Sequence, residues 1–351
     1  MPDKTAVLPH FIELGTRKIT ELVAILEKHN VVQDRVLLLC DENTAKIGGQ
    51  AIMKTLRKKK LLTFEHRVEN SDEKTVFRVE QEIKHNGCDL VIGFGGGKVL
   101  DVAKLAAAKN SSTFISVPTT LSNDGIASPI SVIKDARNIP ISHITQPPFG
   151  VIIDIDIVKR APRRHLMAGV GDLISNLSAV FDARLAHEKS EEPIDTSALQ
   201  LSEAGGKRIM ELPNNDIGSC AFLEELAHGL IKSGFAMCMS GTSRPASGSE
   251  HKISHSIDHY YPPSKGLHGE QVGIASLLTM ALQNNEFLES VRKFYAKIGF
   301  PNKIVYLNLG QDEFTRVVLN ATRIRPERYT ILEDKRPTEQ TVREITEYLS
   351  L

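Results

Sequence analysis

The stretch DLVIGFGGGKVLDVAKLAA, residues 89–107, decides the fold of the first half of the chain. Its apolar start predicts a buried strand, and residues 97–109 have the apolar spacing of a helix. Glycines between the two let the backbone approach a ligand, and the helix offers free N–H groups and a positive dipole end to a phosphate. The spacing is not G-x-G-x-x-G, because Lys98 stands where the last glycine is needed, and it is not a Walker A loop, because Val99 follows the lysine. The stretch predicts a pyrophosphate site, with a turn needed only for helix–strand packing as the alternative.

The same alternation of strand and helix extends to both sides of this stretch. Strands are expected at 36–40, 62–68, 89–93 and 113–118, and helices at 44–60, 73–85 and 97–109. Such alternation predicts βαβ units and a parallel sheet, which 128–134 and 151–154 either complete or extend as a hairpin. From about residue 155 helical patterns dominate, at 164–188, 198–211, 219–239, 247–259, 269–284 and 288–298. The sequence therefore predicts an α/β protein, with a Rossmann-like parallel-sheet domain over residues 1–160 and an all-α domain over residues 161–351.

Composition narrows the classes of partner. The 351 residues include 43 Lys+Arg and 43 Asp+Glu, so the net charge is zero and the molecule as a whole does not attract nucleic acid or anionic membrane. Any recognition of an anionic substrate must then be local. The sequence contains no apolar run of bilayer length and no secretory signal pattern, and its cysteines are widely spaced. We expect a soluble cytoplasmic protein with reduced core thiols at Cys40, Cys88, Cys220 and Cys238.

A polar loop follows the expected strand at 113–118. Residues 118–125 (PTTLSNDG) supply three hydroxyls, an amide and a carboxylate at the sheet edge where open α/β sheets bind ligands. A ligand-facing loop and an ordinary polar loop are both compatible with this composition. Asp41, at the end of the first expected strand, is a weaker candidate for a contact with an adenosine ribose.

Histidines are concentrated in the helical half. Of the 12 histidines, His251, His255, His259 and His268 fall within 18 residues, and the first three recur every fourth residue on one helix face. This pattern is typical of a metal site or of a polar stripe. Asp172, in an apolar helix, is a candidate third ligand, because a buried carboxylate needs a positive partner; a surface residue or a helix cap is the alternative. The spacing fits no zinc finger and favours an open catalytic site.

Five segments together carry a resemblance to a known family. They are GFGGGKVLDVAKLAA (93–107), SVPTTLSNDGIASP (116–129), GVGDLISN (169–176), SGSEHKISHSIDH (247–259) and LHGEQV (267–272). In order and spacing they resemble the metal-dependent polyol dehydrogenases related to iron-containing alcohol dehydrogenases and dehydroquinate synthases, over residues 35–300. Within that group, PTTLSNDGIASP (118–129) resembles the archaeal sn-glycerol-1-phosphate dehydrogenases.

The resemblance implies a reaction and a set of site residues. The reaction is the NAD(P)H-dependent and zinc-dependent reduction of dihydroxyacetone phosphate to sn-glycerol-1-phosphate, the backbone of archaeal membrane phospholipids. One Zn²⁺ per subunit would be bound by Asp172, His251 and His268, and Asp124, Asp172 and His255 would contact substrate and take part in catalysis. The pyrophosphate and nicotinamide of NAD(H) or NADP(H) would lie against Gly95, Gly96, Gly97, Lys98, Val99, Leu100, Asp101, Thr119, Thr120, Leu121, Ser122 and Ser128. Lys98 departs from many relatives, which leaves its role open. A homo-oligomer without nucleic-acid or membrane partners is expected.

Several alternatives remain at this stage. A glycerol dehydrogenase-like polyol oxidoreductase would lack the phosphate requirement, and a dehydroquinate synthase-like lyase would bind a larger sugar phosphate. A nucleotide-sensing module with a structural metal is disfavoured by the open ligand set. The residues do not choose between zinc and iron or between NAD and NADP, and they do not set the configuration of the product. The candidate side chains for the substrate phosphate are Arg163, Arg164, Arg244, Lys252 and Lys265.

Overall fold

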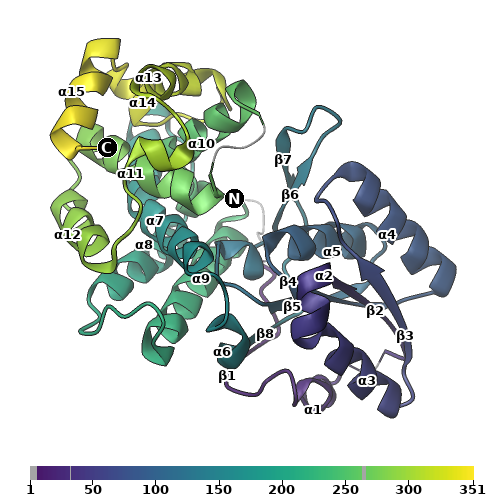
Figure 1. The fold of residues 1–351 in the computed structure, drawn as a ribbon. Coiled ribbons are helices and arrows are strands. Elements are labelled where there is room, and N and C mark those ends of the chain that lie inside the picture. Colours follow the sequence, from purple (N-terminus) through teal and green to yellow (C-terminus); the bar gives the residue numbers. More distant parts are fainter. Residues whose placement is uncertain (1–5, 32, 263–265) are drawn as a thin grey trace. The chain divides into compact units, whose positions relative to one another are not determined.

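The computed structural model describes residues 6–31, 33–262 and 266–351 (Figure 1). The chain divides into two compact units: residues 1–121 with 125–162, and residues 122–124 with 163–351. The short segment Ser122–Asp124 is therefore grouped with the helical second unit, although the chain on both of its sides belongs to the first.

The first unit is built on a parallel sheet, as the sequence predicts, and the sheet has six strands. Its strand order is β1-β8-β5-β4-β2-β3, and each pair of neighbouring strands runs parallel. The strands are β1 (Phe11–Gly15), β2 (Arg35–Cys40), β3 (Leu62–Arg67), β4 (Leu90–Gly95), β5 (Thr113–Pro118) and β8 (Gly150–Asp154). β2, β4 and β8 are apolar and buried almost throughout, which is the pattern of strands covered on both faces.

Helices cover both faces of this sheet (Figure 1). One face packs against α1 (Leu22–Lys28) and α3 (Gln50–Lys58), whose leucines and isoleucines form one apolar cluster with β2, β4 and β5. On the other face lie α4 (Glu73–Asn86) and α5 (Gly97–Lys109), and a Cβ at Gly93 would be 3.1 Å from the Ala103 Cβ of α5. The expected helix at 44–60 is three pieces, α2 (Glu42–Thr44), a π-helical turn Ala45–Gly49, and α3.

Two features of this unit differ from the sequence expectation. Strand β6 (Ile130–Lys134) does not join the main sheet; it pairs antiparallel with β7 (Pro140–Ile144) in a separate hairpin, whereas β8 lies between β1 and β5. The edge strand β1 was not predicted, because its alternation is short and its residues are only half-buried. α6 (Ile155–Val158) ends the unit, and Asp154 caps it by accepting from the Asp156 N–H at 3.0 Å.

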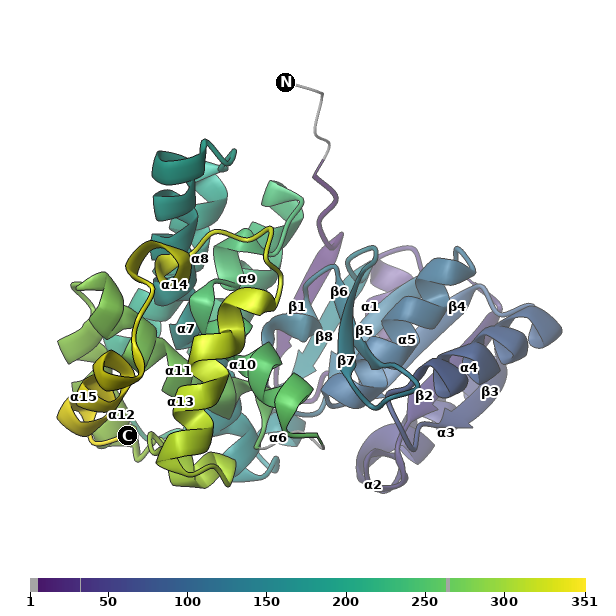
Figure 2. The same ribbon diagram turned by 90° about the horizontal axis from the view of Figure 1, so that it is seen from above.

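The second unit is all helical, as predicted for the second half of the chain. α7 (Arg163–Ser190) is buried along most of its length and packs against α8, α9, α10 and α11 (Figure 2). The remaining helices are α8 (Thr196–Met210), α9 (Cys220–Ser240), α10 (Ser249–Tyr260), α11 (His268–Gln283), α12 (Leu288–Ile298), α13 (Gln311–Asn320), α14 (Ile331–Lys335) and α15 (Glu339–Leu349), with 3-10 turns at Arg244–Ala246, Ile304–Leu307 and Ala321–Arg323. The elements beyond residue 300 were not predicted from the sequence.

Two further predictions can be compared with the structure, one about membrane-spanning segments and one about the cysteines. Among the described residues no helix is both long and apolar enough to cross a membrane. All four cysteines are free, as expected; Cys40, Cys88 and Cys238 are buried, but Cys220 is exposed at the start of α9, so its prediction as a core thiol was wrong.

Candidate functional site

The glycine turn lies at the carboxyl end of the central strand β4. Gly95 ends the strand, Gly96 occupies the N-cap position of α5, and Gly97 is the first helical residue. A Cβ at Gly95 would lie 2.6 Å from the Val99 Cβ, so only glycine lets the helix begin directly at the strand end. Gly96 has no side chain to cap α5, and the first N–H groups of the helix remain available to an anion.

The threonine loop after β5 lies beside this turn. Gly95 is paired with Pro118 across the sheet, the Thr119 N–H donates to the Gly95 carbonyl at 3.0 Å, and a Cβ at Gly96 would lie 3.2 Å from the Thr120 Cγ2. The Thr120 hydroxyl is buried, and within the described part of the chain it has no hydrogen-bond partner. A buried hydroxyl without a partner is costly, so this position favours a polar ligand at the turn.

The other predicted cofactor residues have different surroundings. Val99, Leu100, Leu121 and Ser128 are at most 1% exposed, so the two helix residues could meet a cofactor only through their backbone. Lys98 Nζ donates to the Glu69 carbonyl at 3.0 Å, while Ser122 belongs to the second unit. Asp41 is the N-cap of α2, where its carboxylate accepts from the Asn43 and Thr44 N–H groups; this gives Asp41 a structural role in helix capping.

A close crossing of two helices brings the candidate metal ligands together in the second unit. A Cβ at Gly171 of α7 would lie 2.0 Å from the Gly269 carbonyl oxygen of α11, and one at Gly269 would lie 1.8 Å from the Ala168 carbonyl oxygen. Glycine at both positions allows backbone-to-backbone packing. Asp172 directly follows Gly171, and His268 directly precedes Gly269. The close packing of the two glycines therefore brings the Oδ1 of Asp172 within 3.6 Å of the Nε2 of His268.

His251, on α10, completes the set. Its Nε2 lies 3.2 Å from the Nε2 of His268, and one ligand atom each from Asp172, His251 and His268 all lie within 4.8 Å of one another. Two imidazole nitrogens bound to one zinc at about 2.05 Å and a tetrahedral angle would be about 3.3 Å apart. The separation of the two imidazole nitrogens therefore matches that of two ligands on one metal ion, and the Asp172 Oδ1 lies 3.6 Å from one of them.

Hydrogen bonds on the far side of each imidazole direct both Nε2 atoms to the same point. The Nδ1 of His251 faces the Glu250 carboxylate at 2.9 Å, and the Nδ1 of His268 faces the Ser254 hydroxyl at 3.2 Å. Ser254 donates its own proton to the Gln271 Oε1 at 2.6 Å, so it accepts from His268. Both rings then carry their proton on Nδ1, and both Nε2 lone pairs point to one position, an arrangement that a cation stabilises.

The electrostatics of the set also favour a bound cation. Burial lowers the pKa of His251 to about 3, with smaller effects of Arg325 and Arg328, and burial followed by the charge on His251 lowers that of His268 to about 3. Both imidazoles are therefore neutral at pH 7 and able to bind a metal ion. Burial, then the nearby Asp124 carboxylate, raises the pKa of Asp172 well above its usual value. A metal ion would offset that cost, because it supplies the positive charge that a buried carboxylate lacks.

His255 and Asp124 lie next to this set without belonging to it. The ring centroid of His255 is 6.5 Å from those of both His251 and His268, and burial followed by Arg325 lowers its pKa well below the usual value. Asp124 donates its N–H to Asp172 Oδ2 at 2.9 Å, and its carboxylate accepts from the Ser233 hydroxyl at 2.7 Å. Both therefore lie beside the candidate metal ligands. His259 is exposed, and its ring makes an edge-to-face contact with Tyr260.

The basic residues predicted to bind a substrate phosphate have other partners. Arg164 forms a bidentate pair with Glu270 at 2.6 and 2.7 Å, and Arg244 forms one with Glu192. Arg163 donates to the Ile298 carbonyl, and Lys252, fully buried, pairs with Glu333 at 2.6 Å. Lys265 lies outside the described residues.

Three groups near the histidines were missed by sequence reasoning. Glu250 precedes His251 directly, and an acid next to a candidate ligand is a signal that could have identified it. Arg325 and Arg328 lie in the loop before α14, where the sequence has no pattern that connects them to α10.

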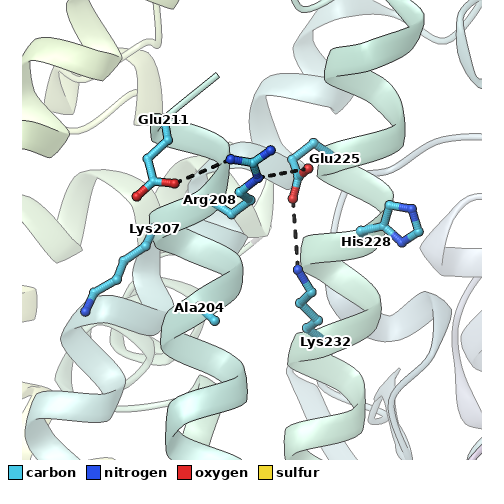
Figure 3. A pocket seen from close by; sticks show the side chains of 7 residues that line it. All are labelled: Ala204, Lys207, Arg208, Glu211, Glu225, His228 and Lys232. Carbon is cyan, nitrogen blue, oxygen red and sulfur yellow. Dashed lines mark ion pairs between the residues drawn. The ribbon is translucent and has the colours of Figure 1, made fainter. Parts of the chain in front are cut away.

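A surface pocket elsewhere in the second unit is unrelated to these residues. It lies between α8 and α9, and Figure 3 shows that its charges pair with one another: Arg208 with Glu211 and Glu225, and Lys232 with Glu225. Its lining includes none of the predicted site residues.

The first unit matches a family of alcohol dehydrogenases, and the whole chain shares its fold with solved dehydrogenases. Residues 13–162 match the family model described as iron-containing alcohol dehydrogenase. The crystal structure of glycerol dehydrogenase from Schizosaccharomyces pombe superimposes with a TM-score of 0.80 at 20% identity, covering 99% of this chain and 91% of that one, which shows a shared fold.

The chain belongs to the glycerol-1-phosphate dehydrogenase family. It is 34% identical over 346 residues to glycerol-1-phosphate dehydrogenase (NAD(P)+) of Nitrosopumilus maritimus, covering 98% of this chain and 96% of the relative. It is 35% identical over 350 residues to the protein of the same name in Methanosphaera stadtmanae, covering 98% of each. The protein is thus an oxidoreductase, and the resemblance recognised in the sequence is confirmed.

Proposed function

We propose that this protein catalyses the NAD(P)H-dependent reduction of dihydroxyacetone phosphate to sn-glycerol-1-phosphate, with one Zn²⁺ per subunit. The observation that carries the proposal is the set of Asp172, His251 and His268, in which a hydrogen bond at Nδ1 orients each imidazole. The relatives named glycerol-1-phosphate dehydrogenase match this chain over nearly their whole length, which supports the same reaction. A structural zinc site normally has four protein ligands, and a three-ligand set leaves a position for substrate.

The two units have separate roles in this proposal. Residues 1–160 act as the dinucleotide-binding domain, in which the first turn of α5 and the Thr119–Thr120 loop hold the pyrophosphate and the nicotinamide side of NAD(H) or NADP(H). Residues 161–351 bind the metal and the ketone. The chain passes from the first unit into the second between Leu121 and Ser122.

The chain's own residues prepare the ketone for reduction. When bound, Zn²⁺ supplies the Lewis acidity that polarises the C2 carbonyl, and NAD(P)H supplies the hydride. Asp172 uses its two oxygens differently: Oδ1 faces the histidines, and Oδ2 holds the backbone of Asp124 in place. Asp124 and His255 bind the substrate beside the carbonyl. The neutral ring of His255 relays a proton to the C2 oxygen, directly or through water, and takes up a proton on its other nitrogen as it gives one. In sum, ketone, NAD(P)H and a proton give the alcohol and NAD(P)+.

The product suggests the biological setting. sn-Glycerol-1-phosphate would provide the backbone of archaeal phospholipids, and we infer that the protein works in the cytoplasm as a homo-oligomer, without nucleic-acid or membrane partners.

Two assays test this function. NADH consumption is followed with dihydroxyacetone phosphate and with dihydroxyacetone, and chiral analysis identifies the product. Consumption only with the phosphorylated ketone supports the proposal, whereas equal rates indicate a glycerol dehydrogenase-like enzyme and no consumption leaves a lyase of the dehydroquinate synthase type. Metal analysis of His251→Ala provides the second test: zinc and activity should be lost together, and retained zinc with normal turnover contradicts the ligand assignment.

A further inference from the structure

We propose that Ser233 is a positioning residue: it holds the carboxylate of Asp124 so that this carboxylate accepts a hydrogen bond from the free hydroxyl group of the substrate. The consequence is selectivity for a ketone that carries a hydroxyl group on the carbon next to the carbonyl. The inference deepens the proposed function and rests on it, because it takes Asp124 as a residue that contacts the substrate.

The packing of α9 against α7 brings Ser233 close to the candidate metal ligands. A Cβ at Gly229 of α9 would lie 2.3 Å from the Leu173 Cδ2, so glycine at this position lets α9 approach α7 at the residue that follows Asp172. Ser233 lies one helical turn after Gly229, on the same face of α9. The two helices are in contact and lie side by side in both views (Figures 1 and 2).

Two hydrogen bonds hold Asp124 between these helices. Its N–H donates to the Asp172 Oδ2 of α7 at 2.9 Å, and its own Oδ2 accepts from the Ser233 hydroxyl of α9 at 2.7 Å. The Oδ1 of Asp172 in turn lies 3.6 Å from the Nε2 of His268. A continuous chain of polar contacts therefore connects Ser233, through Asp124, with two of the candidate metal ligands.

The bond from Ser233 to a carboxylate differs from that of a comparable buried serine. Ser202 of α8 is fully buried and donates to the backbone carbonyl of Pro245 at 2.6 Å, a bond that serves packing alone. Ser233 is 1% exposed, but its acceptor, the side chain of Asp124, belongs to a half-buried residue. A hydrogen bond to a charged group is stronger than one between neutral groups, so Ser233 fixes the orientation of this carboxylate and stabilises its charge.

The chemistry of a carboxylate decides which end of the substrate Asp124 binds. Dihydroxyacetone phosphate carries a hydroxyl group and a phosphate group on opposite sides of its carbonyl. An ionised carboxylate is an acceptor only, so it binds the hydroxyl group and repels the phosphate. Asp124 lies beside the ligands of the metal that would polarise the carbonyl, and the hydroxyl group is on the adjacent carbon. The hydroxyl end of the substrate therefore faces Asp124.

The test uses two ketones that differ only in this hydroxyl group. Dihydroxyacetone phosphate has it, and hydroxyacetone phosphate has a hydrogen in its place while keeping the carbonyl and the phosphate. For Ser233→Ala, Ser233→Thr and the matched control Ser202→Ala, kcat/KM is measured for both ketones with NADH, together with the KM for NADH and the zinc content. Ser202→Ala removes an equally buried hydroxyl group that bonds a backbone carbonyl.

In Ser233→Ala we expect kcat/KM for dihydroxyacetone phosphate to fall about 10-fold or more, the size of a hydrogen bond to a charged group. The value for hydroxyacetone phosphate, the KM for NADH and the zinc content should stay within about threefold. Ser233→Thr keeps the hydroxyl group and should recover most of the loss, and Ser202→Ala should behave like the unmodified protein. In an Asp124→Asn background, Ser233→Ala should cause less than about a twofold further loss, because the group that it positions is already changed.

Three results would overturn the inference: an equal loss for both ketones in Ser233→Ala, no loss for either, or a further 10-fold loss in the Asp124→Asn background. If Ser233→Ala does not fold, Ser233→Cys decides, because it keeps the side-chain size and replaces the hydroxyl group by a weak donor. Failure of the proposed function is distinguishable: the unmodified protein would then reduce neither ketone, whereas an active enzyme that is insensitive to Ser233→Ala contradicts this inference alone.

Discussion

The close crossing of α7 and α11 makes a quantitative prediction about metal binding. Gly171→Ala would place a Cβ 2.0 Å from the Gly269 carbonyl oxygen, where contacts below 3.0 Å essentially never occur, so the two backbones must separate by about 1 Å or more. The obstacle is a backbone carbonyl, which cannot rotate away as a side chain can. Because Asp172 follows Gly171 directly and His268 precedes Gly269, this movement displaces two of the three candidate ligands.

Metal ligands tolerate a displacement of only about 0.2 Å. Loss of an outer hydrogen-bond partner alone weakens metal binding about 10–100-fold, so we expect Gly171→Ala to lower zinc affinity about 100-fold or more. Overpacking should also lower the free energy of unfolding by about 1–3 kcal/mol. Gly273→Ala should have a smaller effect, because its Cβ would meet the Phe300 ring at 2.5 Å and the Gly171 Cα at 2.9 Å.

The measurement is titration of the metal-free protein with Zn²⁺ against a chromophoric chelator, together with urea unfolding with and without metal. Gly218→Ala is the matched control, since its Cβ would meet only the Asp216 Oδ1 at 3.4 Å, an ordinary contact. Zinc affinity in Gly171→Ala equal to that of Gly218→Ala would refute the claim that the helix crossing positions the ligands.

Three further predictions concern the groups that support α10. Glu250→Gln should weaken zinc binding about 10–100-fold, because it removes the carboxylate that accepts from the His251 Nδ1; an unchanged zinc titration would contradict this. Burial lowers the pKa of His251 from 6.5 to about 3, so between these values the unfolded metal-free chain binds a proton that the folded chain does not, and stability falls as the pH falls. In urea unfolding of the metal-free protein from pH 7 to pH 4, His251→Asn should show a smaller fall in the free energy of unfolding than the unmodified protein. An identical fall in both proteins would contradict this explanation. Asp182→Ala should cost about 2–5 kcal/mol in the same assay, because the Ser249 and Ile331 N–H groups, bonded at 2.7 and 2.8 Å, lose their acceptor; a change below about 1 kcal/mol would exclude this role.

Local sequence patterns predicted the elements that form the centre of each unit. The short continuous apolar runs of β2, β4 and β5 and the long apolar segments of helices α7 to α12 differ in length, so the type of each element could be predicted from the sequence. The edge strand β1 has only five residues, mostly half-buried, and the partner of β6 was not recognised because β7 is exposed and irregular. Elements with weak burial lack the periodic signal on which such predictions depend.

Local sequence patterns also pointed to the candidate metal ligands. His251 and His255 lie one helical turn apart, and a carboxylate such as Asp172 in an apolar helix contradicts the surrounding pattern, so both stand out in the sequence alone. Their orientation was not predictable. The crossing that places Asp172 beside His268 depends on Gly171 and Gly269, which are nearly 100 residues apart along the chain and have no pattern in common.

The position of α10 depends on charged groups that come from distant parts of the chain. Asp182 of α7 accepts from the N-terminal Ser249 N–H at 2.7 Å, and Glu333 of α14 pairs with the buried Lys252 at 2.6 Å. Arg328 donates to the carbonyl of Ser247, two residues before the helix. A buried charge is stable only when its partner is in place, so these three contacts fix α10 to α7, to α14 and to the loop between α13 and α14. Substitutions at residues 325–333 should therefore alter metal binding by His251 even where they touch no ligand.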